Sequence, residues 1–177
     1  MELPQVRHVK CSFSIDRSVL KHAVDRISIN HKMRVKRFHN FNVIRGGGEG
    51  FVYTAFHSGH VNVVGIKCVG DIDEVVDTFC KQLDLVPNGL CSPIRVDNIT
   101  ASGTFGHRIN LVHILEEEPI EETIIKFRPS FFPGMSIKHE PYGSMILFNS
   151  GAFSIVGAKK MDHINKIFSK VCTIVNA

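Results

Sequence analysis

Apolar and polar residues alternate along several stretches of the chain, and this alternation predicts β-strands with one buried and one exposed face. In residues 6–14 the apolar face carries Val9, Cys11 and Phe13. The polar face of the same stretch carries His8, Lys10, Ser12 and Ser14. Elsewhere apolar residues recur at helical spacing, which predicts amphipathic helices over residues 16–29 and 71–83.

One pattern of strands and turns occurs twice along the chain. The segment FHSGHVNVVGIK at 56–67 aligns with FNSGAFSIVGAK at 148–159 without a gap. Farther back, VRHVKCS at 6–12 aligns with VDNITAS at 96–102. An internal duplication therefore covers nearly the whole chain.

Each repeat follows the order β-α-β-β-β-β-α, and two helices can cover only one face of five strands. The fold class we expect is therefore α+β, with duplicated halves that form one antiparallel sheet, helices on one face and an open opposite face. We expect a first repeat in residues 1–87 and a second in 88–177, joined at 86–89 in one continuous body. Parity assigns to the open face His8, Lys10, Ser12, Thr54, Phe56, His60, Asn62, Val64, Asn98, Thr100, Ser102, Ile146, Phe148, Ala152, Ser154 and Val156.

Several local boundaries follow from turn residues and apolar spacing. A basic loop at 31–37 leads into a strand from Phe38 to Ile44, and GGGEG at 46–50 forms a flexible hairpin tip. Gly157-Ala158-Lys159 opens the final helix. The spacing of Ile109, Val112 and Leu115 predicts the apolar stripe of the second-repeat helix before it.

Composition narrows the class of protein only modestly. The chain of 177 residues is 44% hydrophobic, which indicates a sizeable core, and its net charge of +4 permits an anionic partner without requiring one. Five cysteines without a CxxC spacing favour reduced thiols in an intracellular protein. Because no signal peptide precedes Leu3 and no apolar run reaches membrane-spanning length, we expect a cytosolic or nuclear protein without membrane contact.

Motifs of enzymes and of metal or nucleotide sites are absent from the sequence. GGGEG is not followed by GK[ST] and opens no helix, so it is not a phosphate-binding loop. His57 and His60 are three residues apart, but no cysteine or carboxylate cluster accompanies them. We expect no catalytic residues, no metal and no cofactor.

The ordered strings of the two repeats resemble the TATA-box-binding protein family over the whole chain. They are KRF at 36–38, AFHSG at 55–59, VGIK at 64–67, FFPGM at 131–135, ILFNSG at 146–151 and VGAK at 156–159. The resemblance implies a saddle whose open sheet face binds A/T-rich double-stranded DNA in the minor groove and bends it. Minor-groove binding with a kink is the mechanism for which this family serves as a standard example.

The family's functional residues transfer position by position. Four phenylalanines match the side chains that wedge between base steps: Phe38, Phe56, Phe132 and Phe148. The positions that match minor-groove contacts carry His8, Lys10, Asn62, Val64, Asn98, Thr100, Ile146, Ser154 and Val156. Asn98 matches one of the family's two central asparagines, whereas His8 replaces the other, so we expect an altered or relaxed preference for the TATA sequence. Basic positions that match phosphate contacts carry Arg45, Lys67, Lys138 and Lys159.

The implied role is that of a general initiation factor that nucleates assembly of the transcription machinery in the nucleus, or in a viral replication compartment if a virus encodes it. The acidic loop that docks transcription factor IIB in the family reads FRPSF at 127–131, so that partner or another polymerase-recruiting protein would bind differently. A homodimer could cover the open face without DNA. The alternatives are an interaction scaffold that has lost DNA bending and, less favoured by an open sheet face, a carrier of lipids or small molecules.

Overall fold

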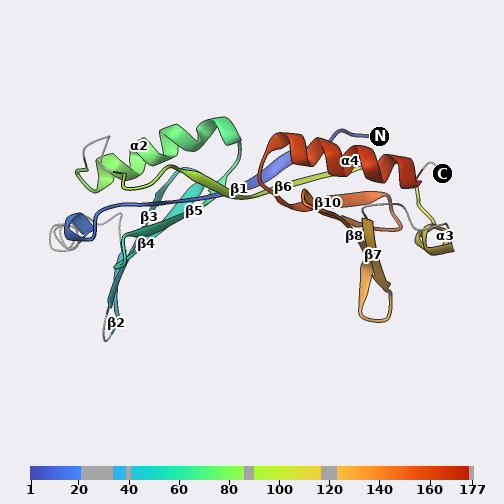
Figure 1. The fold of residues 1–177 in the computed structure, drawn as a ribbon, viewed down its shortest axis with the longest axis horizontal. Helices are drawn as coiled ribbons and strands as arrows, with labels where there is room; N and C mark the ends of the chain where they lie inside the picture. Colours follow the sequence, from blue (N-terminus) through green and yellow to red (C-terminus); the bar gives the residue numbers. More distant parts are fainter. Residues whose placement is uncertain (21–33, 39–40, 86–89, 117–122, 176–177) are drawn as a thin grey trace. The chain divides into compact units, whose positions relative to one another are not determined.

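The computed structural model of the chain describes residues 1–20, 34–38, 41–85, 90–116 and 123–175, and side chains are described throughout these ranges except at 34–38 and 41–42. The described residues form two compact units. One unit comprises residues 8–97, and the other comprises residues 1–7 together with 98–177. Each unit is an antiparallel sheet of five strands with a long helix packed on one face (Figure 1).

The unit of residues 8–97 contains the first copy of the pattern. Its strands are β1 (Gln5–Ser14, from His8 onward), β2 (Arg34–Phe38), β3 (Phe41–Gly48), β4 (Phe51–Phe56) and β5 (His60–Ile66). Their order across the sheet is β2-β3-β4-β5-β1, and a 3₁₀ turn η1 (Val69–Asp71) leads into helix α2 (Ile72–Gln82). A further helix begins at residues 17–20, where the Asp16 carboxylate accepts a 2.7 Å hydrogen bond from the Ser18 backbone N–H; the rest of the helix predicted to residue 29 lies outside the described residues.

The second unit repeats this arrangement. Its strands are β6 (Arg95–Thr104, from Asn98 onward), β7 (Thr123–Arg128), β8 (Phe132–His139), β9 (Gly143–Leu147) and β10 (Ala152–Ala158). Their order is β6-β10-β9-β8-β7, with a short helix α3 (Leu111–Glu116) and a long helix α4 (Met161–Val175). The α+β class and the duplicated element order expected from the sequence are confirmed.

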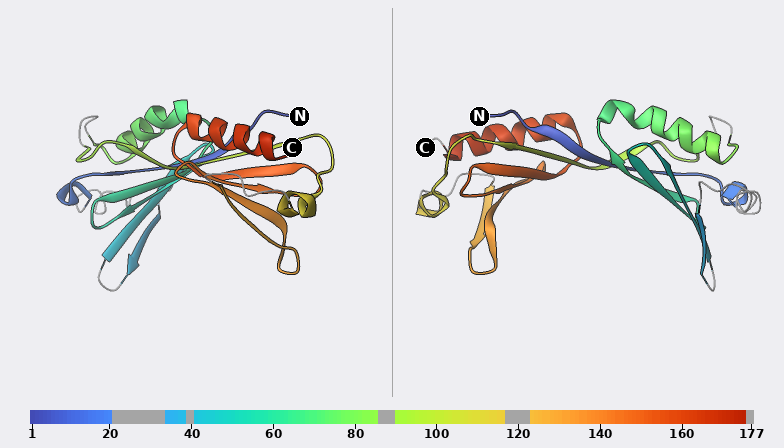
Figure 2. Two further views of the ribbon diagram at one scale, coloured as in Figure 1. Left: turned by 45° about the vertical axis from the view of Figure 1, so that its right-hand side comes forward. Right: turned by 180° about the vertical axis from the view of Figure 1, so that it is seen from behind.

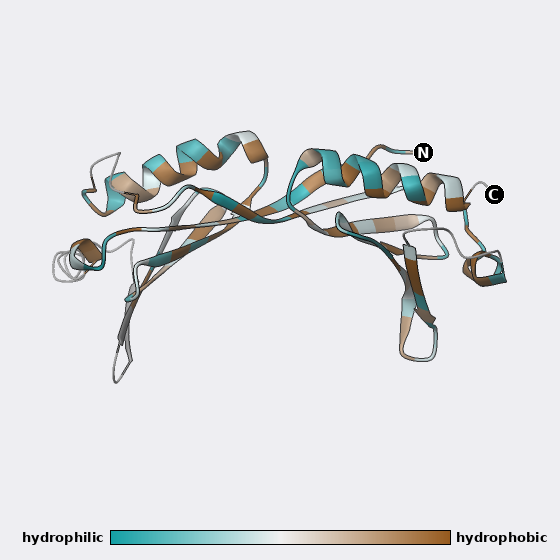
Figure 3. Cartoon of the chain, viewed as in Figure 1, coloured by the Kyte–Doolittle hydropathy of each residue, from teal (hydrophilic) through white to brown (hydrophobic). Residues whose placement is uncertain are grey.

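Both long helices cover one face of their own sheet (Figure 2). Hydrophobic positions recur along both helices (Figure 3). The stripe of α2 is Ile72, Val75, Val76, Phe79 and Cys80. The stripe of α4 is Ile164, Ile167, Phe168, Val171 and Ile174. The ring of Phe79 packs edge-on against Phe13 of β1 at 5.2 Å and against Tyr53 of β4 at 4.9 Å between centroids. These contacts leave the opposite face of each sheet without a helix among the described elements.

The duplication extends to irregularities of the strands. In the first unit the β1–β5 register shifts between Val9 and Cys11, and in the second the β10–β6 register shifts between Ile155 and Ala158. The turns that precede β5 and β10 each use a glycine at positive φ, Gly59 and Gly151. A Cβ at Gly59 would lie 2.3 Å from the Ile15 carbonyl oxygen, and one at Gly151 would lie 2.1 Å from the His107 carbonyl oxygen. Only glycine fits these turns in either copy.

The compact units and the sequence repeats differ at their ends. Residues 1–7 belong with the second copy, where the Glu2 backbone N–H donates a 2.8 Å hydrogen bond to the Thr104 carbonyl oxygen. Residues 88–97 belong with the first copy, where the Cys91 N–H donates to the Ser14 carbonyl oxygen at 2.7 Å. The break predicted at residues 86–89 lies outside the described residues.

Four local predictions are wrong. Residues 34–37 belong to strand β2, paired with β3, and not to a basic loop. The single strand expected from Phe38 to Ile44 is instead the end of β2 and the start of β3. Gly46, Gly47 and Gly48 lie in β3 and not in the hairpin tip. A larger residue at position 46 would clash there, because a Cβ would lie 2.2 Å from the Tyr53 hydroxyl. Gly157-Ala158 ends strand β10, and α4 begins at Met161.

The fourth error concerns the stripe of α3. Leu111 and Ile114 are its buried residues, whereas Val112 and Leu115 are 55% and 47% exposed. The Asn110 side chain accepts a 3.2 Å hydrogen bond from the Val112 N–H and starts the helix there, which places Ile109 before it. Among the helices in the part of the chain that is described, none is long and apolar enough to cross a membrane.

Candidate functional site

The open face of the first unit is built from rows of side chains that run across neighbouring strands. One row contains Ser12, Asn62, Thr54 and Arg45, which the strand register places side by side. The neighbouring row contains Ser14, His60, Phe56 and Val43. Val64 is 36% exposed on this face, where β5 places it beside Val52. The register thus brings Phe56, Asn62 and Val64 together on one surface, as parity predicted.

His60 links the phenylalanine of this face to its asparagine. Its imidazole stacks on the Phe56 ring, with centroids 6.3 Å apart and an interplanar angle of 25°. Its Nε2 atom lies 3.2 Å from Oδ1 of Asn62. The polar side chain of Asn62 is therefore oriented by a neighbour that is itself held against a ring.

His8 and Lys10 lie on the same open face, on strand β1. Both are half-buried, and the Lys10 Nζ atom lies 3.8 Å from a carboxylate oxygen of Asp97. Asp97 also accepts a 3.0 Å hydrogen bond from Nε of Arg95. Since the Lys10 side chain is 40% exposed, it keeps access to solvent and to an anionic ligand.

The open face of the second unit has the same rows with different residues. The central row contains Ser102, Ser154, Ile146, Ser136 and Lys126. The next row contains Val156, Ser144, Lys138 and Ile124. An isoleucine, Ile146, thus occupies the row position that Thr54 holds in the first unit.

Asn98 is fixed by two hydrogen bonds on this face. Its Oδ1 atom accepts a 2.7 Å bond from the Gly157 backbone N–H, and its Nδ2 atom donates to Oγ1 of Thr100 at 3.2 Å. Gly157 lies in the β10 bulge with φ of 85°, which aims its N–H at the asparagine. The amide nitrogen of Asn98 keeps a second hydrogen that can be donated to a ligand.

Two phenylalanine rings meet near the start of β8. Phe132 and Phe148 pack edge-on with centroids 5.8 Å apart, and Phe132 is 47% exposed. Gly134 makes room for them, because a Cβ there would lie 2.6 Å from the Phe132 ring and 3.0 Å from the Phe148 ring. The adjacent Phe131, at the hairpin tip, is 87% exposed. An exposed apolar edge of this kind is typical of a binding site.

The remaining predicted positions are partly described. Phe38 is the last residue of β2 and pairs with Phe41, and its side chain lies outside the described part of the chain. Arg45, Lys67 and Lys159 are exposed. Lys138 donates a hydrogen bond to Glu140, which holds the pKa of that carboxyl group below its usual range.

Comparisons with known proteins agree on one family. Residues 93–177 match the sequence model of transcription factor TFIID (or TATA-binding protein, TBP). The chain is 27% identical over 177 residues to TATA-box-binding protein-like 1 of Entamoeba histolytica, which covers 99% of this chain and 80% of that protein. It is 28% identical over 125 residues to TATA-box-binding protein 2 of Haloferax volcanii, covering 69% of this chain and 66% of the relative, slightly under two thirds of its length.

A solved structure adds the fold to these sequence matches. The Methanococcus jannaschii TBP matches with a TM-score of 0.75 and 20% sequence identity, covering 99% of both chains. The present chain therefore resembles the TATA-box-binding protein family in sequence and in fold. Members of this family are non-enzymatic factors, which confirms the expectation that the protein is not an enzyme.

The structure also adds residues that the sequence did not single out. The Nε atom of Arg7 donates a 2.8 Å hydrogen bond to Oγ of Ser102 on the open face of the second unit. Strand parity assigns Arg7 to the apolar side of β1, so alternation carried no signal for this contact. Lys126 and Asp97 were likewise missed, because their roles depend on cross-strand register and not on local sequence.

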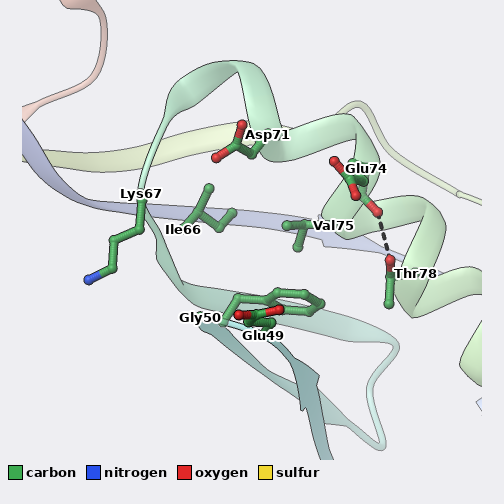
Figure 4. Close-up of a pocket in the computed structure, with 9 residues that line it drawn as sticks. Glu49, Gly50, Ile66, Lys67, Asp71, Glu74, Val75 and Thr78 are labelled. Atoms are coloured by element: carbon green, nitrogen blue, oxygen red, sulfur yellow. Dashed lines mark hydrogen bonds between the residues drawn. The ribbon is translucent and has the colours of Figure 1, made fainter.

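The helix-covered side of the first unit carries a shallow pocket of about 160 Å³ beside the start of α2 (Figure 4). Its lining includes Glu49, Phe51, Asp71 and Glu74. In the second unit, the corresponding hairpin and helix bring Tyr142 against the ring of His163 at 5.2 Å, with Lys166 Nζ 4.7 Å from the tyrosine ring centroid. The two copies therefore differ on the helix side as well as on the open face.

No group of three or more histidine, cysteine or carboxylate side chains suited to a metal ion occurs among the described residues of the chain. Burial, followed by the nearby Asp97 carboxylate, raises the pKa of the Cys11 thiol to about 11. Cys11 is fully buried, so its thiol stays protonated and acts as a packing group at neutral pH.

Proposed function

We propose that this protein is a transcription initiation factor that binds DNA through the minor groove and bends it. The similarity to TATA-box-binding proteins supports a transcription-related DNA-binding role. The observation that best supports bending is the pair Phe132 and Phe148, whose rings meet over Gly134 at the edge of an open sheet face. Flat apolar rings of this kind can enter between base pairs and replace the stacking lost at a kink.

The four wedge residues act in pairs in this proposal. Phe132 and Phe148 unstack a base step at one end of the site, and Phe38 and Phe56 do so at the other. Unstacking costs about a few kcal/mol per step, which is offset because bent DNA contacts more of the protein surface. A phenylalanine suits this task because its ring leaves no polar atom without a hydrogen-bond partner.

The floor of the minor groove is read by the open-face residues between the wedges. At A·T pairs the groove offers only acceptors, so donors such as the free amide hydrogen of Asn98 suit it. The proposed contacts are His8, Lys10, Asn62, Val64, Asn98, Thr100, Ile146, Ser154 and Val156. Because His8 and Lys10 bring an imidazole and an ammonium group to the centre of this surface, we propose that the TATA preference is relaxed while A/T-rich DNA remains the substrate.

Basic side chains at the margins supply affinity without sequence information. Arg45, Lys67 and Lys159 are exposed and are proposed to contact phosphates, together with Lys138 once it leaves Glu140. Each phosphate contact adds close to one unit to the slope of log affinity against log salt.

The bent complex is proposed to nucleate assembly of the transcription machinery in the nucleus, or in a viral replication compartment for a virus-encoded chain. Protein partners include a transcription factor IIB-like or other polymerase-recruiting protein. The hairpin tip that would meet it offers the exposed ring of Phe131 and the guanidinium of Arg128 in place of acidic residues, which calls for an altered partner surface. In the absence of DNA, a second copy of the chain is proposed to bind over the apolar edge formed by Phe132 and Phe148.

Binding to inosine-substituted duplexes tests the groove that is read. An I·C pair resembles A·T in the minor groove and G·C in the major groove, because inosine lacks the guanine amino group. Replacing every A·T pair of an A/T-rich duplex by I·C should leave affinity within about threefold, whereas G·C replacement should lower it by roughly tenfold or more. Equal loss with I·C and G·C would contradict minor-groove reading, and parallel titrations of TATA and scrambled A/T duplexes measure the relaxed preference.

A further inference from the structure

We propose that the two copies of the fold read different base pairs: the first unit accepts a G·C pair through Asn62, whereas the second unit is restricted to A·T. This inference rests on the minor-groove binding proposed above. It adds an assignment of specificity to each half, and it makes Asn62 and His60 the residues that create the difference.

The aligned rows of the two open faces differ in hydrogen-bonding capacity. The first unit places Asn62 beside Thr54, and the second places Ser154 beside Ile146 at the same register positions. A guanine in the minor groove adds one donor, its exocyclic amino group, to the acceptors that every base pair shows there. A surface that accepts G·C must therefore supply an acceptor, and a surface that rejects it meets the amino group with apolar or donor groups.

Asn62 carries the required acceptor, and its neighbours hold it in place. The side-chain amide offers an oxygen with two lone pairs and an NH₂ group with two hydrogens. His60 engages Oδ1 at 3.2 Å, while the imidazole itself is held by stacking on Phe56. One lone pair of Oδ1 and the NH₂ group remain, so the amide can accept from a guanine amino group or donate to a base acceptor. In the second unit, Ala152 occupies the position that corresponds to His60. Its methyl group cannot orient a neighbouring side chain in this way.

The second unit presents the opposite chemistry. The Oδ1 atom of Asn98 is taken by the Gly157 N–H at 2.7 Å, which turns the amide so that its NH₂ group is available. Ile146 contributes only methyl and methylene groups, and the hydroxyl of Ser154 ends one bond nearer the backbone than the amide of Asn62. A guanine amino group placed over Ile146 and the Asn98 amide meets an apolar side chain and a donor, and there it loses its hydrogen bond to water.

Four duplexes with one symmetric A/T-rich core test the proposal directly. The first is unmodified, the second carries one G·C pair in one half, the third carries G·C at the matching position of both halves, and the fourth replaces one of those two G·C pairs by I·C. The protein can place its first unit over either half, so the single G·C pair should be tolerated, with affinity within about threefold of the unmodified duplex. The double G·C duplex should bind roughly tenfold or more weakly, and I·C in one half should restore it.

Each departure from that pattern has a definite meaning. A tenfold loss with a single G·C pair would overturn the inference by showing that both units reject guanine, and full binding of the double G·C duplex would overturn it by showing that neither does. Both results would leave minor-groove binding intact. Failure to bind the unmodified and I·C duplexes alike would instead overturn the proposed function and this inference together.

The variant Asn62→Val assigns the difference to one side chain. The measured quantity is the ratio of affinities for the single G·C duplex and its single I·C counterpart, which differ only in the guanine amino group. We expect Asn62→Val to lower this ratio by roughly tenfold, and Ser154→Val, the matched change in the other unit, to leave the ratio unchanged. Thermal unfolding of both variants checks that each is folded, and an unchanged ratio in folded Asn62→Val would overturn the assignment.

Discussion

Asn98 accepts a 2.7 Å hydrogen bond on its Oδ1 atom from the backbone N–H of Gly157. This hydrogen bond orients the side-chain amide, so that its oxygen faces Gly157 and its NH₂ group faces the open side of the sheet. The floor of the minor groove offers acceptors at A·T pairs, so the bond prepares the side chain for the ligand before the ligand arrives.

Asn98→Asp should separate binding from folding. The carboxylate can still accept the Gly157 hydrogen bond, but it presents an oxygen and a negative charge where an N–H donor stood. We expect affinity for an A/T-rich duplex to fall by roughly tenfold or more, measured by fluorescence anisotropy, with little change in the midpoint of thermal unfolding. Unaltered affinity in a folded variant would show that Asn98 does not face DNA.

Gly134→Ala tests how the wedge rings are seated. An added Cβ would lie 2.6 Å from the Phe132 ring and 2.8 Å from a methyl group of Ile146. Because the Phe132 ring is 47% exposed, we expect it to move outward, but Ile146 must also shift, so the variant should lose about 1–3 kcal/mol of stability. Bending of a bound duplex should decrease, and bending equal to that of the unaltered protein would mean that the ring positions do not matter.

The turn glycines provide a matched pair for stability. Gly50 has φ of 79° and open space where a Cβ would be added, whereas Gly151 has φ of 84° and the His107 carbonyl oxygen only 2.1 Å from that position. Gly50→Ala should cost about 1 kcal/mol for the positive φ alone. Gly151→Ala adds a clash with backbone and should cost at least about 3 kcal/mol, measured by urea unfolding. Similar costs for the two variants would contradict the tight turn.

Alkaline unfolding should depend on Cys11. Its folded-state pKa is raised to about 11 from an ordinary value of 9.0, so the unfolded chain loses the thiol proton first as pH rises. Stability contributed by the neutral thiol is complete below about pH 9 and falls as the pH rises from there to about 11. Cys11→Ala should therefore show a shallower loss of unfolding free energy in that window, and an identical slope in both proteins would contradict the buried thiol.

The fold could be predicted from the sequence because the duplication provides two copies of each strand and helix pattern. Alternation fixed the open-face parity of β1, β5 and β10, and the register of the strands agrees with it. The errors fall where a signal was ambiguous. Leu111 and Ile114 have the same three-residue spacing as Val112 and Leu115, and a six-residue helix is too short for periodicity to choose between them.

The sequence predicted which residues lie at the candidate site, but not which neighbours their side chains contact. Parity and resemblance placed Phe56, Asn62 and Asn98 on one kind of surface without indicating what each side chain contacts. The hydrogen bond from Gly157 depends on a β-bulge, and the seat of Phe132 depends on Gly134 two residues away on the same strand. Both require three-dimensional register, which a single sequence does not contain.

DNA bending is the most direct test of the central claim. Energy transfer between dyes at the two ends of a short A/T-rich duplex would be measured during titration with the protein, in parallel with the double variant Phe132→Ala/Phe148→Ala. The account predicts a large shortening of the end-to-end distance that weakens with salt and is lost in the double variant. Tight binding without shortening, or equal shortening by the double variant, would contradict it.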